Sequence, residues 1–260
     1  MGLFSSSKKP QTKAEVLSVQ PTRTIFLKQH IGLAKTITAY DITSVVKSEF
    51  ASDEFKKEAR ELANSGSVPP CLKMYLSNIF TKKYSIKMPL ELISQPVPAE
   101  PQADADVAPV QPAPFSTSKA DLVEVSELTL ALFANGAKKL TFDPEHTNKT
   151  PNLKLKPCGE SSEEEAFTLN GITYKWQLET KALTVTKFNL VKQLPDRSLV
   201  IGRLWAPAKW MRSSAITFDE GELDWIVVMS TCCALIAKLV QKVGNDKGSD
   251  LVEDLTTILS

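Results

Sequence analysis

Residues 223–240 read LDWIVVMSTCCALIAKLV and carry the strongest structural signal in this sequence of 260 residues. No charged residue lies between Asp224 and Lys238, and the polar positions repeat with neither the period of a strand nor that of an amphipathic helix. Acidic residues precede the stretch and lysines follow it, which complements the dipole of a helix. We therefore predict a helix over about 223–243 that is apolar on every side and is ended by Gly244.

A helix without a polar face must be surrounded either by lipid or by protein. A membrane span needs roughly 20 apolar residues, whereas the uncharged run here covers only residues 225–237. Extending the helix to Val243 would place Lys238 in hydrocarbon unless its side chain snorkels to the membrane surface. We therefore expect a helix enclosed by its own protein, and a closed sheet of the preceding strands is the simplest enclosure.

Short β-prone runs separated by Gly, Pro, Asn and Asp fill most of the remaining chain, which predicts a β-rich α+β fold. The clearest run places Tyr174 and Trp176 on one face and Lys175 on the other. Asn135-Gly136 and Asn170-Gly171 supply the positive φ angles that tight hairpin turns require. Strands are predicted over 22–27, 36–42, 72–80, 83–88, 128–133, 140–142, 167–169, 172–178, 183–191, 198–205 and 214–218.

Two further segments shape the expected organisation. One short extra helix is predicted over 52–63, with Ser52 as its N-cap. Residues 95–119 are rich in Pro, so they can neither pair as a strand nor continue a helix, and we expect an extended or disordered segment. That segment either separates two domains or forms a long loop within one domain.

The stretch Phe167-Thr-Leu-Asn-Gly-Ile-Thr-Tyr-Lys-Trp176 and the later stretch Leu223-Asp-Trp-Ile-Val-Val228 form two motifs. Together they resemble the fungal tubby C-terminal-like domain proteins, which belong with the tubby, LURP-one-related and phospholipid scramblase proteins. The family pattern F-x-x-x-G-x-x-Y-x-W is followed by two strands and then by L-D-x-I-V-V, and the similarity is clear over about 160–243. The positions that match the pattern are Phe167, Gly171, Tyr174, Trp176, Leu223, Asp224, Ile226, Val227 and Val228.

The resemblance implies a closed antiparallel barrel of twelve strands around a central hydrophobic C-terminal helix. Such a barrel takes strands from both sides of the Pro-rich segment, which makes that segment an insertion. The expected organisation is a flexible arm over 1–18, one barrel domain over 19–243 with the insertion at 95–119, and a C-terminal tail over 244–260 with a short amphipathic helix.

Composition argues against several classes of function. The net charge is +1, so the chain lacks the broad positive field of a nucleic-acid-binding protein. The only histidines, His30 and His146, lack metal or triad spacing, and no nucleophile-elbow, P-loop or dinucleotide-binding motif occurs. Cys232 and Cys233 lie in the apolar helix, where thiols behave as small hydrophobes. We expect a protein that is not an enzyme and that has no cofactor and no metal.

The N-terminus combines a lipidation motif with basic residues. Met1-Gly2-Leu-Phe-Ser-Ser6 fits the myristoylation pattern, with an unmodified N-terminus as the alternative. A fatty chain on Gly2 would enter a bilayer, where Lys8, Lys9 and Lys13 would meet anionic headgroups. No secretory signal precedes this motif, so we expect a cytoplasmic protein with reduced thiols, held at the inner face of a membrane.

Tubby binds phosphoinositide headgroups through basic residues on its barrel, and the resemblance implies a similar surface here. The candidate lipid-binding residues in the barrel are Lys138, Lys139, Lys154 and Lys156, and ordinary solvated lysines are the alternative. The calcium-binding segment and the cysteine-rich region of scramblases are not visible in the sequence, which argues against scramblase activity.

Three functions remain open from the sequence. The first is a membrane-peripheral module that binds anionic phospholipid or phosphoinositide headgroups or recruits a partner. The second is a soluble adaptor that binds proteins through its Pro-rich loop and C-terminal helix. The third is a scramblase-like or single-span membrane protein.

Overall fold

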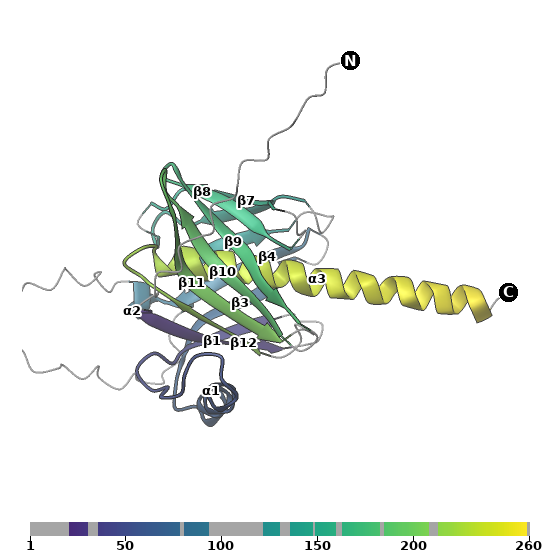
Figure 1. Cartoon of the computed structure of the whole chain (residues 1–260), viewed down its shortest axis with the longest axis horizontal. Coiled ribbons are helices and arrows are strands. Elements are labelled where there is room, and N and C mark those ends of the chain that lie inside the picture. The colour runs from purple at the N-terminus through teal and green to yellow at the C-terminus, as the bar shows by residue number, and fades with distance from the viewer. Residues whose placement is uncertain are drawn as a thin grey trace, which may run out of the picture.

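The computed structural model shows a closed antiparallel β-barrel of twelve strands with one helix running through it (Figure 1). It describes residues 21–30, 36–78, 81–93, 122–130, 136–147, 149–159, 163–182, 185–207 and 213–258. The strands are β1 (Arg23–His30), β2 (Thr36–Asp41), β3 (Pro70–Asn78), β4 (Lys83–Pro89), β5 (Leu122–Thr129), β6 (Lys138–Phe142), β7 (Leu153–Pro157), β8 (Glu165–Leu169), β9 (Ile172–Lys181), β10 (Val185–Gln193), β11 (Ser198–Pro207) and β12 (Ser213–Phe218). The helices are α1 (Asp53–Ser65), α2 (Leu90–Ile93) and α3 (Trp225–Ile258).

Each strand pairs with its neighbours in sequence, and β1 closes the barrel against β12. Strands β4 and β5 pair directly, with Pro89 opposite Leu122, although the Pro-rich segment lies between them in the chain. The two halves of the sequence therefore form one barrel. The predicted insertion at 95–119 itself lies outside the described residues.

Helix α3 lies inside the barrel from its first turn (Figure 1). Asp224 caps it, because its Oδ1 accepts a hydrogen bond of 2.7 Å from the Ile226 amide. Residues 226–239 are all buried, and Ser230 on the helix meets Ser126 on β5 at 2.9 Å between their hydroxyl oxygens. The predicted enclosure of an apolar helix by its own sheet is confirmed.

The end of α3 differs from the prediction. The helix does not stop at Gly244 but continues as one helix to Ile258, so its predicted end near residue 243 is wrong. A glycine inside a helix costs only about 1 kcal/mol relative to alanine, so it does not by itself end a helix. Beyond the barrel the backbone of α3 extends away from the strands (Figure 1). Among the described residues, no helix has the length and apolar character that crossing a bilayer requires.

The barrel wall is buried on both faces where α1 covers it. On β1, Ile25 and Leu27 point into the main core around α3, while Phe26 points outward into a second core. Phe55 and Ala59 of α1 pack into that second core. As predicted, Ser52 caps α1, and its hydroxyl accepts a hydrogen bond of 3.0 Å from the Phe55 amide.

Most predicted strands are present, with two differences. Strand β5 begins and ends earlier than the predicted 128–133, and β7 was not predicted. Strand β7 nevertheless carries the period-two signal, because Leu153 and Leu155 are buried and the residues that follow each are exposed. The hairpin prediction at Asn170-Gly171 is confirmed by φ angles of 50° and 79°.

Candidate functional site

Three of the predicted lysines gather on the outer face of β6 and β7. Lys139, Lys154 and Lys156 are exposed, because the residues beside them in each strand, such as Leu140 and Leu155, point into the barrel. Lys139 and Lys154 are direct partners across the β6–β7 pair. Like charges placed directly opposite each other destabilise a sheet. An anion bound between Lys139 and Lys154 would reduce this repulsion, so the pair is suited to bind one.

A fourth lysine, Lys175 of β9, extends this outer row. Lys156 of β7 is the register partner of Ala166 on β8, and Ala166 is in turn the partner of Lys175. The alternation of its strand predicts that Lys175 lies on the polar face, but its place beside the other lysines depends on strand order and is not visible in the sequence. We call Lys139, Lys154, Lys156 and Lys175 the lysine surface.

The four lysines of the lysine surface form no ion pair among the described residues. Within the described ranges, none of its four ammonium groups lies within ion-pair distance of an acidic side chain. Other lysines of the wall are paired, such as Lys83 with Glu127 at 2.9 Å and Lys181 with Glu163 at 2.6 Å. The surface therefore has the charge and the freedom to contact an external anion.

Lys138 does not belong to this surface. It was predicted together with Lys139, but consecutive residues of a strand point to opposite faces, and the Lys138 side chain is only 2% exposed. Inside the barrel its Nζ donates hydrogen bonds to Glu165 Oε1 and, at 3.3 Å, to the carbonyl oxygen of Gly136. Lys138 therefore has a structural partner within the core and cannot reach a headgroup.

Lys138 is one member of a buried ionic cluster. Lys238 of α3 donates to the same Glu165 Oε1, so two ammonium groups share one carboxylate oxygen. Glu165 is fully buried and Lys238 is 2% exposed. Glu165 Oε2 has no hydrogen-bond partner among the described residues, and neither does Nε1 of Trp176, the register partner of Glu165. We call Lys138, Glu165 and Lys238 the buried cluster.

The buried cluster holds more positive than negative charge. With all three groups ionised, two lysines and one glutamate give a net charge of +1 inside an apolar core. Burial lowers the pKa of Lys138, and the charge of Lys238 acts in the same direction, while Glu165 opposes both. Protonation of Lys138 therefore costs free energy in the folded barrel.

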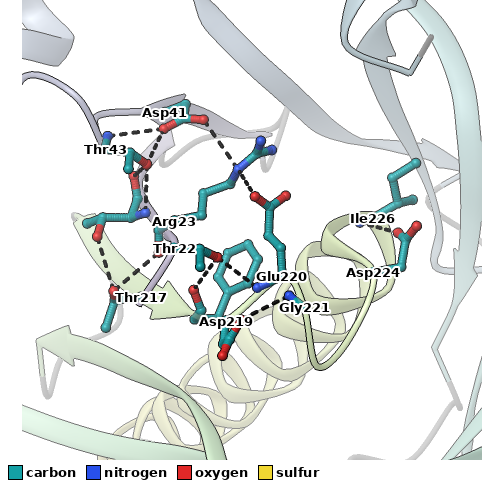
Figure 2. Close-up of polar contacts among 12 residues, drawn as sticks. Thr22, Arg23, Asp41, Thr43, Thr217, Asp219, Glu220, Gly221, Asp224 and Ile226 are labelled. Carbon is teal, nitrogen blue, oxygen red and sulfur yellow. Dashed lines mark hydrogen bonds and ion pairs between the residues drawn. The ribbon is translucent and has the colours of Figure 1, made fainter. Parts of the chain in front are cut away.

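A second polar network lies at the end of the barrel where α3 begins (Figure 2). Arg23 of β1 approaches two carboxylates, with Nε at 3.5 Å from Asp41 Oδ2 and at 3.1 Å from Glu220 Oε2. Its guanidinium carbon lies 4.6 Å from the ring centroid of Trp225, the first residue of α3. Arg23 therefore joins β1, β2, the loop before α3 and α3 itself.

Threonine hydroxyls complete this network along the seam between β1 and β12. Thr22 Oγ1 accepts a hydrogen bond of 2.8 Å from the Glu220 amide, and Thr217 Oγ1 donates at 3.2 Å to the carbonyl oxygen of Arg23 (Figure 2). Thr43 donates at 2.6 Å to Asp41, which holds that carboxylate near Arg23. Burial raises the pKa of Glu220, and Arg23 opposes this rise. These contacts are structural, because they connect the β1–β12 seam and β2 to the start of α3.

The remaining reactive groups are buried or scattered. Burial raises the pKa of Cys233 to about 12 and the pKa of Cys232 well above its ordinary value, so neither thiol ionises readily near neutral pH. In the part of the chain that the structure describes, no group of three or more His, Cys, Asp and Glu side chains could hold a metal ion. The N-terminal candidates Gly2, Lys8, Lys9 and Lys13 lie outside the described residues.

No protein-family model, curated protein or solved structure matches this chain. The assignment of function therefore rests on the barrel, the lysine surface and the sequence motifs.

Proposed function

We propose that this protein is a non-catalytic, membrane-peripheral module of the tubby-like kind that binds anionic phospholipid headgroups through its lysine surface. The observation that supports this proposal is the outer row of four lysines over β6 to β9, in which Lys139 and Lys154 face each other across adjacent strands. Phosphoinositide and phosphatidylserine headgroups both carry the negative charge that such a row attracts.

The expected affinity follows from the number of charges. Each lysine near an anionic membrane contributes roughly 1 kcal/mol, so four lysines provide about 4 kcal/mol at low ionic strength. A myristoyl group on Gly2 alone gives only marginal binding, with an association constant of about 10⁴ M⁻¹. The two contributions together would give reversible attachment at the cytoplasmic face of a membrane.

Sedimentation with lipid vesicles tests the proposal on the full chain. The unmodified protein is expected to sediment with vesicles that contain phosphatidylserine or a phosphoinositide, and to remain in solution with vesicles of phosphatidylcholine alone. The double variant Lys139→Glu/Lys154→Glu should lose binding to the anionic vesicles, and added salt should weaken binding of the parent protein.

A matched control is available on α1, where Lys57 and Arg60 are exposed on the far side of the second core. The variant Lys57→Glu/Arg60→Glu changes the net charge by the same amount and should bind as the parent does. Equal loss of binding in both double variants would show a general charge effect and would refute the lysine surface. The anchor is tested separately, because Gly2→Ala should shift the protein from membrane to soluble fractions in its own cell.

A further inference from the structure

Strand β7 is the most weakly paired strand in the barrel wall. Its register pairing with β8 covers only Lys156 and Pro157, and proline has no amide hydrogen to donate. One further backbone hydrogen bond, from the Cys158 amide to the Glu164 carbonyl oxygen at 3.2 Å, follows this short pairing. Its pairing with β6 is confined to Leu153, Lys154 and Leu155. By contrast, β10 pairs with β11 along its whole length, from Val185 to Gln193. Backbone hydrogen bonds thus hold β7 less firmly than they hold β10.

The buried cluster spans this weak part of the wall from the inside. Lys138 lies on β6 and Glu165 on β8, so their ion pair joins the two strands that flank β7. Lys238 attaches the same carboxylate to α3. A single side chain, Glu165, therefore links β6, β8 and the central helix where β7 itself provides few bonds.

Electrostatic repulsion acts on both faces of the same strands. On the outside, Lys139 faces Lys154 across the β6–β7 pair. On the inside, the cluster holds a surplus positive charge when both of its lysines are protonated. Movement of β6 away from β7 and α3 would relieve both repulsions and would expose the cluster to water.

We propose that β6, β7 and β8 form a segment of the barrel that opens locally, and that the buried cluster of Lys138, Glu165 and Lys238 is the closure that holds this segment against α3. This inference goes beyond the proposed binding of headgroups, since it concerns the interior face of the strands and does not depend on any ligand.

The charges around the cluster set the direction in which pH acts on it. Lys138 comes from β6, Glu165 from β8 and Lys238 from α3, and Cys158, just after β7, interacts electrostatically with both Glu165 and Lys238. Opening gives Lys138 access to water, where it takes up a proton that the closed state disfavours. Between the lowered pKa of Lys138 in the closed barrel and the pKa of a solvated lysine, about 10.4, acidification therefore favours the open segment, and a rise in pH favours the closed barrel.

Hydrogen exchange followed by mass spectrometry on the full chain tests this proposal. Peptides over 138–142, 153–157 and 165–169 should exchange faster than peptides over 185–193 and 198–207. After correction for intrinsic rates, the excess should grow by up to about tenfold for each pH unit of acidification, because one proton is taken up on opening. Equal exchange throughout the barrel at all pH values would overturn the proposal.

Two substitutions distinguish a role of the buried cluster in local opening from a general effect on the stability of the barrel. Glu165→Gln leaves two buried lysines without a carboxylate and should speed exchange in β6 to β8 by about 100-fold. The control Glu222→Gln removes the partner of Lys192, a pair at 2.7 Å elsewhere in the barrel, and should leave β6 to β8 unchanged. If both variants accelerate exchange equally in β6 to β8, the cluster is not the closure.

Lys138→Met keeps the proposal testable even if Glu165→Gln does not fold. This variant removes the surplus charge and leaves Glu165 paired with Lys238. Exchange in β6 to β8 should then lose its excess pH dependence, even where loss of the link between β6 and β8 raises the exchange rate at every pH. A pH dependence that persists in Lys138→Met would show that another group drives opening, and would contradict the proposal.

Discussion

Replacing Arg23 with methionine would remove the positive charge that connects β1 to β2, to the loop after β12 and to the first residue of α3. The long apolar stem remains, so the change removes the guanidinium and little else. Removal of the guanidinium abolishes the ion pairs to Asp41 and Glu220 and the cation–π contact over the Trp225 ring. The two carboxylates would then lie near each other without a counter-charge.

The size of the effect follows from exposure. The Arg23 side chain is 20% exposed and its two carboxylate partners are 35% and 31% exposed, so each ion pair contributes about 0.2–1 kcal/mol, as partly screened pairs do. The cation–π contact adds about 0.5–1 kcal/mol. Together these contributions predict that Arg23→Met lowers the free energy of unfolding by about 1–3 kcal/mol.

Urea unfolding measures this loss as a lower midpoint at unchanged slope. Lys56→Met is the matched control, because Lys56 also combines one ion pair, to Asp53, with a contact over a tryptophan, Trp205. Its carboxylate partner is 92% exposed, so its removal should cost less than the removal of Arg23. If Arg23→Met proves no more destabilising than Lys56→Met, the contacts of Arg23 do not stabilise the barrel by the expected amount.

Three further predictions concern separate parts of the fold. In Gly202→Ala the new Cβ would lie 3.1 Å from the Phe218 Cβ, and this overpacking should lower the free energy of unfolding in urea by about 1–3 kcal/mol. A loss near zero would show that β12 moves away to make room. Ser52→Ala removes the cap of α1 and should cost about 1 kcal/mol by the same measurement, and Ser52→Asp should restore most of it. Burial lowers the pKa of Lys138 in the folded state, so the free energy of unfolding of the parent protein should rise with pH from that lowered pKa up to about 10.4, the pKa of an unfolded lysine. The variant Lys138→Met should lack this rise. Parallel pH profiles of the two proteins would refute the assignment of the rise to Lys138.

The sequence predicted the features that depend on local pattern. The unbroken apolar run in α3 predicted its enclosure, because no surface helix could expose such residues at every angle. Asn170-Gly171 predicted its hairpin because few other residue pairs adopt two positive φ angles readily.

Features that depend on distant partners were not predictable in this way. Nothing near Lys138 in the sequence indicates Glu165 or Lys238, which lies 73 residues beyond Glu165 and on another element. Lys138 and Lys139 were grouped together because the predicted strand covers only 140–142, whereas β6 begins at Lys138 and its alternation places the two side chains on opposite faces. Strand β7 was missed because it is short and ends in Pro157, although its alternation was visible.

The closure of the barrel by β1 and β12 has a consequence for how the chain folds during synthesis. The Thr22 amide donates a hydrogen bond to the carbonyl oxygen of Phe218, 196 residues later, and the core-filling helix follows later still. Because translation adds about 5–20 residues per second, β12 leaves the ribosome on the order of 10–40 s after β1, and the edge of β1 stays unpaired for that time. During that time apolar residues of the growing sheet face solvent, so we expect the nascent protein to depend on chaperones until α3 has been made.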